Sequence, residues 1–136
     1  MTPLDAFHEL SYYTLSHKKE EFIHQYVVDA YAAQTADKNT KSIKINFGLI
    51  GLYLHLEKGF SGKEVQRAHM ALARYKDKLP IIHLPEKRGE ITVFDVLQAP
   101  EGEERVAKIE AWMESVWGAY KNEQQKIKDF LEKYLL

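Results

Sequence analysis

The segment at residues 42–58 is the part of this 136-residue chain that most constrains its fold. If it is helical, one apolar row recurs at helical spacing and a second lies beside it. The two rows are Ile43, Phe47, Ile50 and Leu54, and then Leu49, Leu52, Tyr53 and Leu56. A helix that is apolar around most of its circumference has to be covered on all sides. Gly48 and Gly51 each cost about 1 kcal/mol of helix propensity relative to Ala, which indicates close approach by another helix. The sequence therefore predicts a bundle with this helix at its centre.

Capping patterns mark where other helices begin. Ser61 and Glu64 have the spacing of a capping box, in which each side chain bonds the other residue's backbone amide. No strand pattern of comparable strength appears. The helices expected besides 42–58 cover residues 3–15, 19–34, 62–76, 93–98 and 102–135. We expect a single all-α domain over residues 1–136, a compact bundle of five to six helices with a long C-terminal helix.

The composition argues against several classes of function. The chain has 19 basic and 20 acidic residues, whereas nucleic-acid binding proteins usually carry a basic excess or stripe. It has no cysteine, which excludes disulfides, thiolate metal sites and cysteine nucleophiles. Its most apolar run, residues 47–56, is far shorter than the roughly 20 residues that span a bilayer, and residues 1–17 lack the apolar stretch of a signal peptide. We expect a cytoplasmic protein with neither nucleic-acid nor membrane partners.

Histidines on several of the expected helices suggest a metal site inside the bundle. Imidazole is a common ligand for divalent metals, and a site with an open position can activate water. His24 is the first candidate ligand, with His8, His55 and His69 from other helices completing the site. No His-x-x-x-His or Glu-x-x-His pair is present, so the alternative is that each histidine is hydrogen-bonded at the edge of the core.

The helix expected over 19–34 carries more polar chemistry than packing requires. His24 and Tyr31 share one face, and Gln25 and Asp29 form a separate i, i+4 pair. A working carboxylate at Asp29 is consistent with this pattern, and so is a buried structural one bonded to Gln25, to a helix N-terminus or to a Tyr hydroxyl.

The segment at residues 24–34 resembles an uncharacterised bacterial family, a domain of unknown function. The resemblance lies in a His followed by Val-Asp-Ala-Tyr-Ala-x-Gln, and the stretches at 92–97 and 112–117 are similar to the same family. The resemblance implies one helical domain but no reaction, so whether the protein is an enzyme stays open. It singles out four candidate functional residues, which are His24, Asp29, Tyr31 and Gln34.

Three hypotheses of function follow. The first is a domain that acts by binding and forms a homo-oligomer, because the distal half of the helix expected over 102–135 extends an apolar face past the bundle. The residues of that face are Ile127, Phe130, Leu131, Tyr134, Leu135 and Leu136. The alternative is a metal-dependent, hydrolase-like bundle centred on His24. The third is a small-molecule pocket between the helices at 19–34, 42–58 and 102–135, lined by Tyr31, Tyr53 and either Trp112 or Trp117.

Overall fold

A computed structural model describes residues 1–17 and 23–136. In that part of the chain it has seven α-helices, one 3₁₀ helix and no strand, which confirms the all-α prediction. None of the helices described is long and apolar enough to cross a membrane. In chain order they are α1 (Pro3–Ser16), α2 (His24–Thr35), α3 (Ser42–Lys58), α4 (Gly62–Leu72), η1 (Ala73–Lys78), α5 (Val93–Gln98), α6 (Glu103–Ala119) and α7 (Gln124–Tyr134).

Local sequence signals set several of these boundaries. Capping boxes begin α1, α4 and α5, where a Thr or Ser accepts from the third helical amide and an acid bonds back. Gly59, with a φ of 74°, ends α3 in the left-handed conformation that glycine adopts without strain. The predicted start of the second helix, at residue 19, lies outside the described residues. The helix predicted over 62–76 ends as α4 at Leu72 and continues as the 3₁₀ helix η1.

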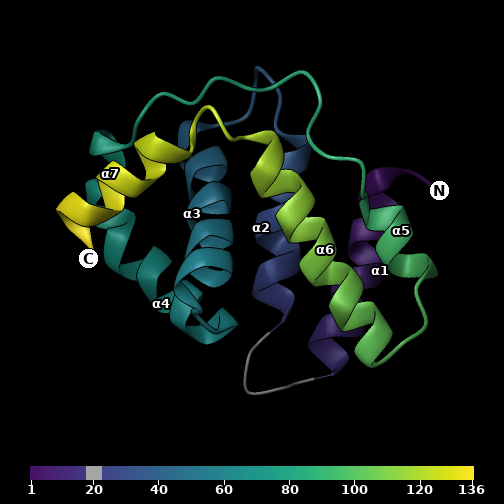
Figure 1. The fold of residues 1–136 in the computed structure, drawn as a ribbon. Coiled ribbons are helices and arrows are strands. Elements are labelled where there is room, and N and C mark those ends of the chain that lie inside the picture. Colours follow the sequence, from purple (N-terminus) through teal and green to yellow (C-terminus); the bar gives the residue numbers. More distant parts are fainter. Residues whose placement is uncertain (18–22) are drawn as a thin grey trace.

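The apolar helix α3 lies at the centre of the bundle, as its composition predicts. Leu49, Ile50, Leu52 and Leu54 are all 0% exposed. Figure 1 shows α2 and α3 in the middle, with α1 and α5 on one side, α4 and α7 on the other, and α6 passing across α2. The chain between η1 and α5 crosses one end of the bundle (Figure 1).

The C-terminal region differs from its prediction. The single helix expected over 102–135 is divided into α6 and α7 by a turn at residues 120–123. Two tertiary contacts hold this turn: the Tyr120 hydroxyl donates to the Ala33 carbonyl at 2.6 Å, and the Glu123 carboxylate accepts from the backbone N–H of His83 at 2.7 Å. Both partners lie far away in sequence, so helical periodicity carries no signal of the break.

The break directs α7 back onto α3. Ile127 and Leu131 are 0% exposed and Phe130 is 5% exposed, so the apolar face predicted to extend past the bundle is part of the core. The terminal Leu136, in contrast, is 52% exposed. The surface on which the expectation of self-association rested is therefore largely absent.

Candidate functional site

The carboxyl group of Asp29 lies inside the bundle, where α2 packs on α3. Asp29 is 3% exposed. Gln25, one turn earlier on α2, donates from Nε2 to Asp29 Oδ1 at 3.1 Å, so the predicted i, i+4 pair forms. Oδ2 has no hydrogen-bond partner among the described residues. A buried polar atom without a partner costs about 1–3 kcal/mol, and such costs are expected chiefly where a residue serves function.

Two glycines of α3 allow α2 to come this close. A Cβ on Gly51 would lie 1.8 Å from Asp29 Oδ2, and a Cβ on Gly48 would lie 3.0 Å from the Asp29 carbonyl oxygen. Any side chain at Gly51 would have to displace the carboxyl group. The sequence predicted close approach at these two glycines, and the structure shows that Asp29 approaches both of them.

Burial raises the pKa of Asp29 well above its ordinary value, and the hydrogen bond from Gln25 opposes part of that rise. The site therefore favours the neutral acid over the carboxylate. A neutral carboxylic acid carries an O–H donor, which an ionised carboxylate lacks.

A pocket of about 450 Å³ lies along the contact between α2 and α3, with walls from α1 and α4. This volume falls within the range of roughly 300–1,000 Å³ that is usual for small-molecule sites. Its lining is mainly apolar, from Leu4, Phe7, Val28, Ala32, Ile43, Phe47 and Gly48. Its polar lining residues are Gln25, Asp29, Tyr31, Lys44 and His69. An apolar pocket with a few convergent polar groups and a perturbed acid has the character of a ligand site.

Two pairs of stacked rings belong to the lining of this pocket. Phe7 of α1 stacks on Tyr31 of α2, with ring centroids 4.2 Å apart. Phe47 of α3 stacks on His69 of α4, with centroids 4.8 Å apart. Burial also raises the pKa of the Tyr31 hydroxyl, which therefore stays a neutral donor.

His69 contributes a neutral imidazole. Its Nε2 lies 2.9 Å from the Phe47 carbonyl oxygen. Burial lowers the pKa of His69 to about 4, an effect that this hydrogen bond partly opposes. At neutral pH the ring is therefore uncharged: Nε2–H donates to the carbonyl, and Nδ1 carries the lone pair of an acceptor.

The other histidines predicted as metal ligands lie in different surroundings. His24 is hydrogen-bonded to Thr14 at 3.0 Å, and burial lowers its pKa. His55 pairs with Glu110 of α6, and His8 is exposed on α1. None of these three lines the pocket over Asp29. Over residues 1–17 and 23–136, no group of three or more His, Cys, Asp or Glu side chains is placed to hold a metal ion.

Gln34, the last candidate from the sequence, anchors the end of α2. Its Nε2 donates to the carbonyls of Ile91 at 2.7 Å and Arg88 at 3.3 Å, and its Oε1 accepts from the indole of Trp112 at 2.8 Å. Both polar atoms of the side chain are thus satisfied by the protein. Gln34 joins three segments and lies outside the lining of the pocket.

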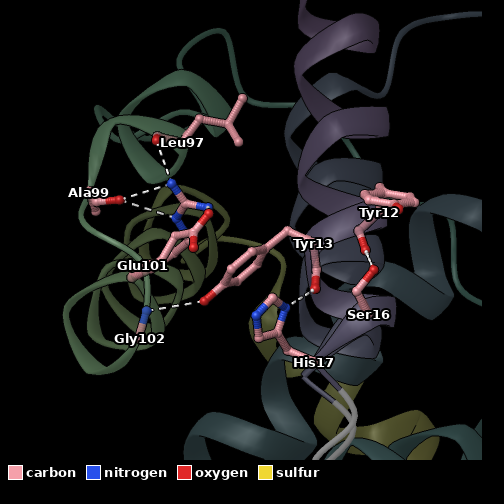
Figure 2. A network of polar contacts seen from close by, with 9 residues as sticks. Tyr12, Tyr13, Ser16, His17, Leu97, Ala99, Glu101 and Gly102 are labelled. Atoms are coloured by element: carbon pink, nitrogen blue, oxygen red, sulfur yellow. Dashed lines mark hydrogen bonds and ion pairs between the residues drawn. The ribbon is translucent and has the colours of Figure 1, made fainter.

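A second pocket, of about 340 Å³, lies where α1 meets the chain around α5 and α6. Figure 2 shows its polar network: the N–H of Gly102 donates to the Tyr13 hydroxyl at 3.1 Å, and His17 Nδ1 lies 2.8 Å from the Tyr13 carbonyl oxygen. Arg105 donates to the carbonyls of Leu97 and Ala99 at 2.7–3.1 Å and lies 4.6 Å from the Tyr13 ring. Its hydrogen bonds thus satisfy carbonyls at the end of α5, which is a structural role.

Sequence reasoning found part of the pocket. It singled out Asp29 and Tyr31 and placed His69 among the metal ligands, and the structure brings all three to one pocket. It missed Phe47 as a lining residue, because an aromatic residue at helical spacing looks like core. Nothing in the sequence distinguishes Lys44 from other surface lysines.

The pocket also lies elsewhere than predicted. Of the aromatic residues expected to line it, Tyr31 does so, whereas Tyr53 contacts Trp117 with ring centroids 5.8 Å apart. Trp112 is 0% exposed and bonded to Gln34. The pocket uses α1 and α4 as walls, in place of α6.

Fold and pocket together define an all-helical protein with a candidate small-molecule site over a buried acid. Residues 4–121 match a family of unknown function (DUF5946), and the chain belongs to that family. The match covers α1 to α6. Comparisons with curated proteins and with solved structures found no match. The family assigns no reaction, so the pocket is the feature from which a function can be inferred.

Proposed function

We propose that this protein binds a small, mainly apolar molecule in the pocket over Asp29. The observation that carries the proposal is a buried acid with an unpartnered oxygen beside a pocket of about 450 Å³. The α2–α3 contact accommodates this acid only because Gly51 has no side chain. A polar group retained at such cost, next to a cavity of ligand size, is typical of a binding site.

The polar groups near Asp29 in the lining of the pocket suit a ligand whose main part is uncharged. Burial favours the neutral, hydrogen-bond-donating forms of Asp29 and Tyr31, and it keeps His69 a neutral imidazole at neutral pH. The stacked ring pairs offer flat apolar surfaces to a ring or a short chain. Binding would therefore combine burial of apolar area with a few hydrogen bonds.

A neutral fluorescent dye, Nile red, provides the test. Val28→Trp fills the pocket from a half-buried position on α2, and the control Met70→Trp adds the same side chain on α4, at a position that is 73% exposed and outside the lining. We expect wild type and Met70→Trp to bind the dye alike, and Val28→Trp to lose at least tenfold in affinity. Equal binding by all three proteins would reject the proposal.

A second filling variant guards against misfolding. Ile43→Trp enters the same pocket from α3, at another half-buried position. Circular dichroism should show native helix content in both variants before the dye is added. A folded variant that fills the pocket and still binds normally would place the dye elsewhere.

The other hypotheses from the sequence stay predictions. Metal binding by His8, His24, His55 and His69 is tested by elemental analysis of untagged wild type and His24→Ala. Self-association is tested by light scattering after size exclusion. Neither has support beyond the sequence pattern that suggested it.

A further inference from the structure

The pocket has two chemically different ends. The atoms nearest to a Cβ on Gly51 all belong to Asp29, whereas those nearest to a Cβ on Gly48 include atoms of Ala32 and Ala33, so α2 and α3 run antiparallel beneath the pocket. The first turn of α3 therefore lies at one end, and Gln25 with Asp29 lies at the other. Between them the walls are the stacked ring pairs described above. An elongated ligand would meet different groups at its two ends.

The end at the first turn of α3 is positive. Lys44 lines the pocket there and is exposed, and within the described residues its ammonium group has no ion-pair partner. The N-cap of this helix, Lys41, makes no side-chain capping bond, and the first turn contains no acid. The partial positive charge of a helix N-terminus adds to that of a lysine in its first turn.

The rest of the pocket lining does not stabilise a charged ligand group. Apart from Lys44, Asp29 is the only other residue of the described lining that can carry a full charge at neutral pH, and burial disfavours its ionised form. A ligand charge is therefore best placed at the Lys44 end, and its sign should be negative.

We infer that the ligand is an organic monocarboxylate whose acid group lies at Lys44 and whose apolar body packs against the side chains of Phe7 and Phe47. This inference rests on the proposed function, because it assigns a chemical class to the occupant of the same pocket. A ligand with a phenyl or short alkyl group would pack that group against these rings and extend toward Gln25.

Three ligands that share one body test the class. 4-Phenylbutyrate, 4-phenylbutanol and 4-phenylbutylamine carry charges of −1, 0 and +1 on the same phenylbutyl group. Each is titrated against Nile red bound to the protein, and the displacement constant is measured. We expect the acid to displace the dye roughly fivefold better than the alcohol, as a partly exposed ion pair at a helix N-terminus provides. The amine should be the weakest.

Two matched variants assign the preference to Lys44. Lys44→Gln should remove most of the advantage of the acid over the alcohol and leave the affinity for the alcohol unchanged. Lys58→Gln, at the exposed far end of α3 and outside the lining, should preserve the fivefold ratio. High salt should also reduce the ratio in wild type, because it screens exposed charges.

The outcomes separate the two proposals. Equal displacement by acid and alcohol, or strongest displacement by the amine, would overturn the inference that the ligand is a carboxylate. The pocket would still stand as a binding site. The second of these results would assign the charged contact to Asp29. Failure of Nile red to bind, or binding that the filling variants leave unchanged, would reject the proposed function itself.

Discussion

The indole of Trp112 donates a hydrogen bond to the side-chain oxygen of Gln34 at 2.8 Å and so joins α6 to the end of α2. The same Gln34 amide donates to Ile91 and Arg88 in the chain that crosses the end of the bundle. One side chain therefore connects three segments that are distant in sequence. Loss of this side chain leaves several partly buried groups without partners at once.

We expect Gln34→Ala to lower the free energy of unfolding by about 1–3 kcal/mol, because the indole N–H and the Ile91 carbonyl lose their partner. Urea unfolding followed by circular dichroism measures the change. Gln125→Ala is the control, since that exposed amide bonds to Asp129 on its own helix. Equal effects of the two substitutions would contradict the structural role assigned to Gln34.

Gly51→Ala should destabilise the protein although alanine favours helices. The new Cβ would lie 1.8 Å from Asp29 Oδ2, and relieving such overpacking costs about 1–3 kcal/mol. Gly118→Ala is the control, because a Cβ there meets nothing within 4 Å and should gain up to about 1 kcal/mol of helix propensity. The clash is measured as the difference in urea midpoint between the two variants, and a Gly51→Ala protein as stable as Gly118→Ala would refute it.

Asp29→Asn should become more stable than wild type as the pH rises. Because the folded pKa of Asp29 is raised, the folded protein keeps a proton that the unfolded chain releases above about pH 4. Wild type therefore loses up to about 1.4 kcal/mol per pH unit from pH 4 until the folded pKa is reached. The neutral amide has no such loss. Urea unfolding across pH 4–8 should show that the difference in free energy of unfolding between Asp29→Asn and wild type grows as the pH rises above 4. A difference that stays constant with pH would contradict the raised pKa of Asp29.

His69 should make the stability of the fold depend on pH in the opposite direction. Its pKa is lowered from 6.5 to about 4, so between those values the unfolded chain binds a proton that the folded protein does not. Stability from this group is present above pH 6.5 and is lost as the pH falls toward 4, by up to about 1.4 kcal/mol per unit. His69→Gln can still donate to the Phe47 carbonyl and removes this loss. In wild type, the NMR resonance of the His69 imidazole is assigned by its absence from the variant and should titrate near pH 4. A midpoint at or above pH 6 would disprove the effect of burial on this pKa.

Ile127→Ala should destabilise the fold, because Ile127 is 0% exposed and α7 packs on α3. A buried Ile-to-Ala change costs about 2–5 kcal/mol. Leu136→Ala, at a position that is 52% exposed, should cost far less. The thermal unfolding midpoint separates the two variants. If Ile127→Ala instead altered only the oligomeric state, α7 would be an interface helix, as the sequence first suggested.

The candidate site shows where sequence reasoning succeeds and where it stops. Asp29 and Gln25 were paired correctly because an i, i+4 spacing fixes their neighbourhood within one helix. Gly51 was recognised as a point of close approach because its cost in a helix demands a reason. That Asp29 and Gly51 meet each other could not be predicted, since their contact depends on the crossing of two helices.

The sequence by itself determined that the fold is helical and where several helices begin or end, because capping boxes, a glycine stop and apolar periodicity act within a few residues of chain. It also determined that α3 is central, since that helix is apolar around most of its circumference. The tertiary structure alone decided the break at residues 120–123, the return of α7 to the core and the place of the pocket. Each of these depends on contacts between residues far apart in sequence, such as Tyr120 with Ala33, whose partners no local pattern specifies.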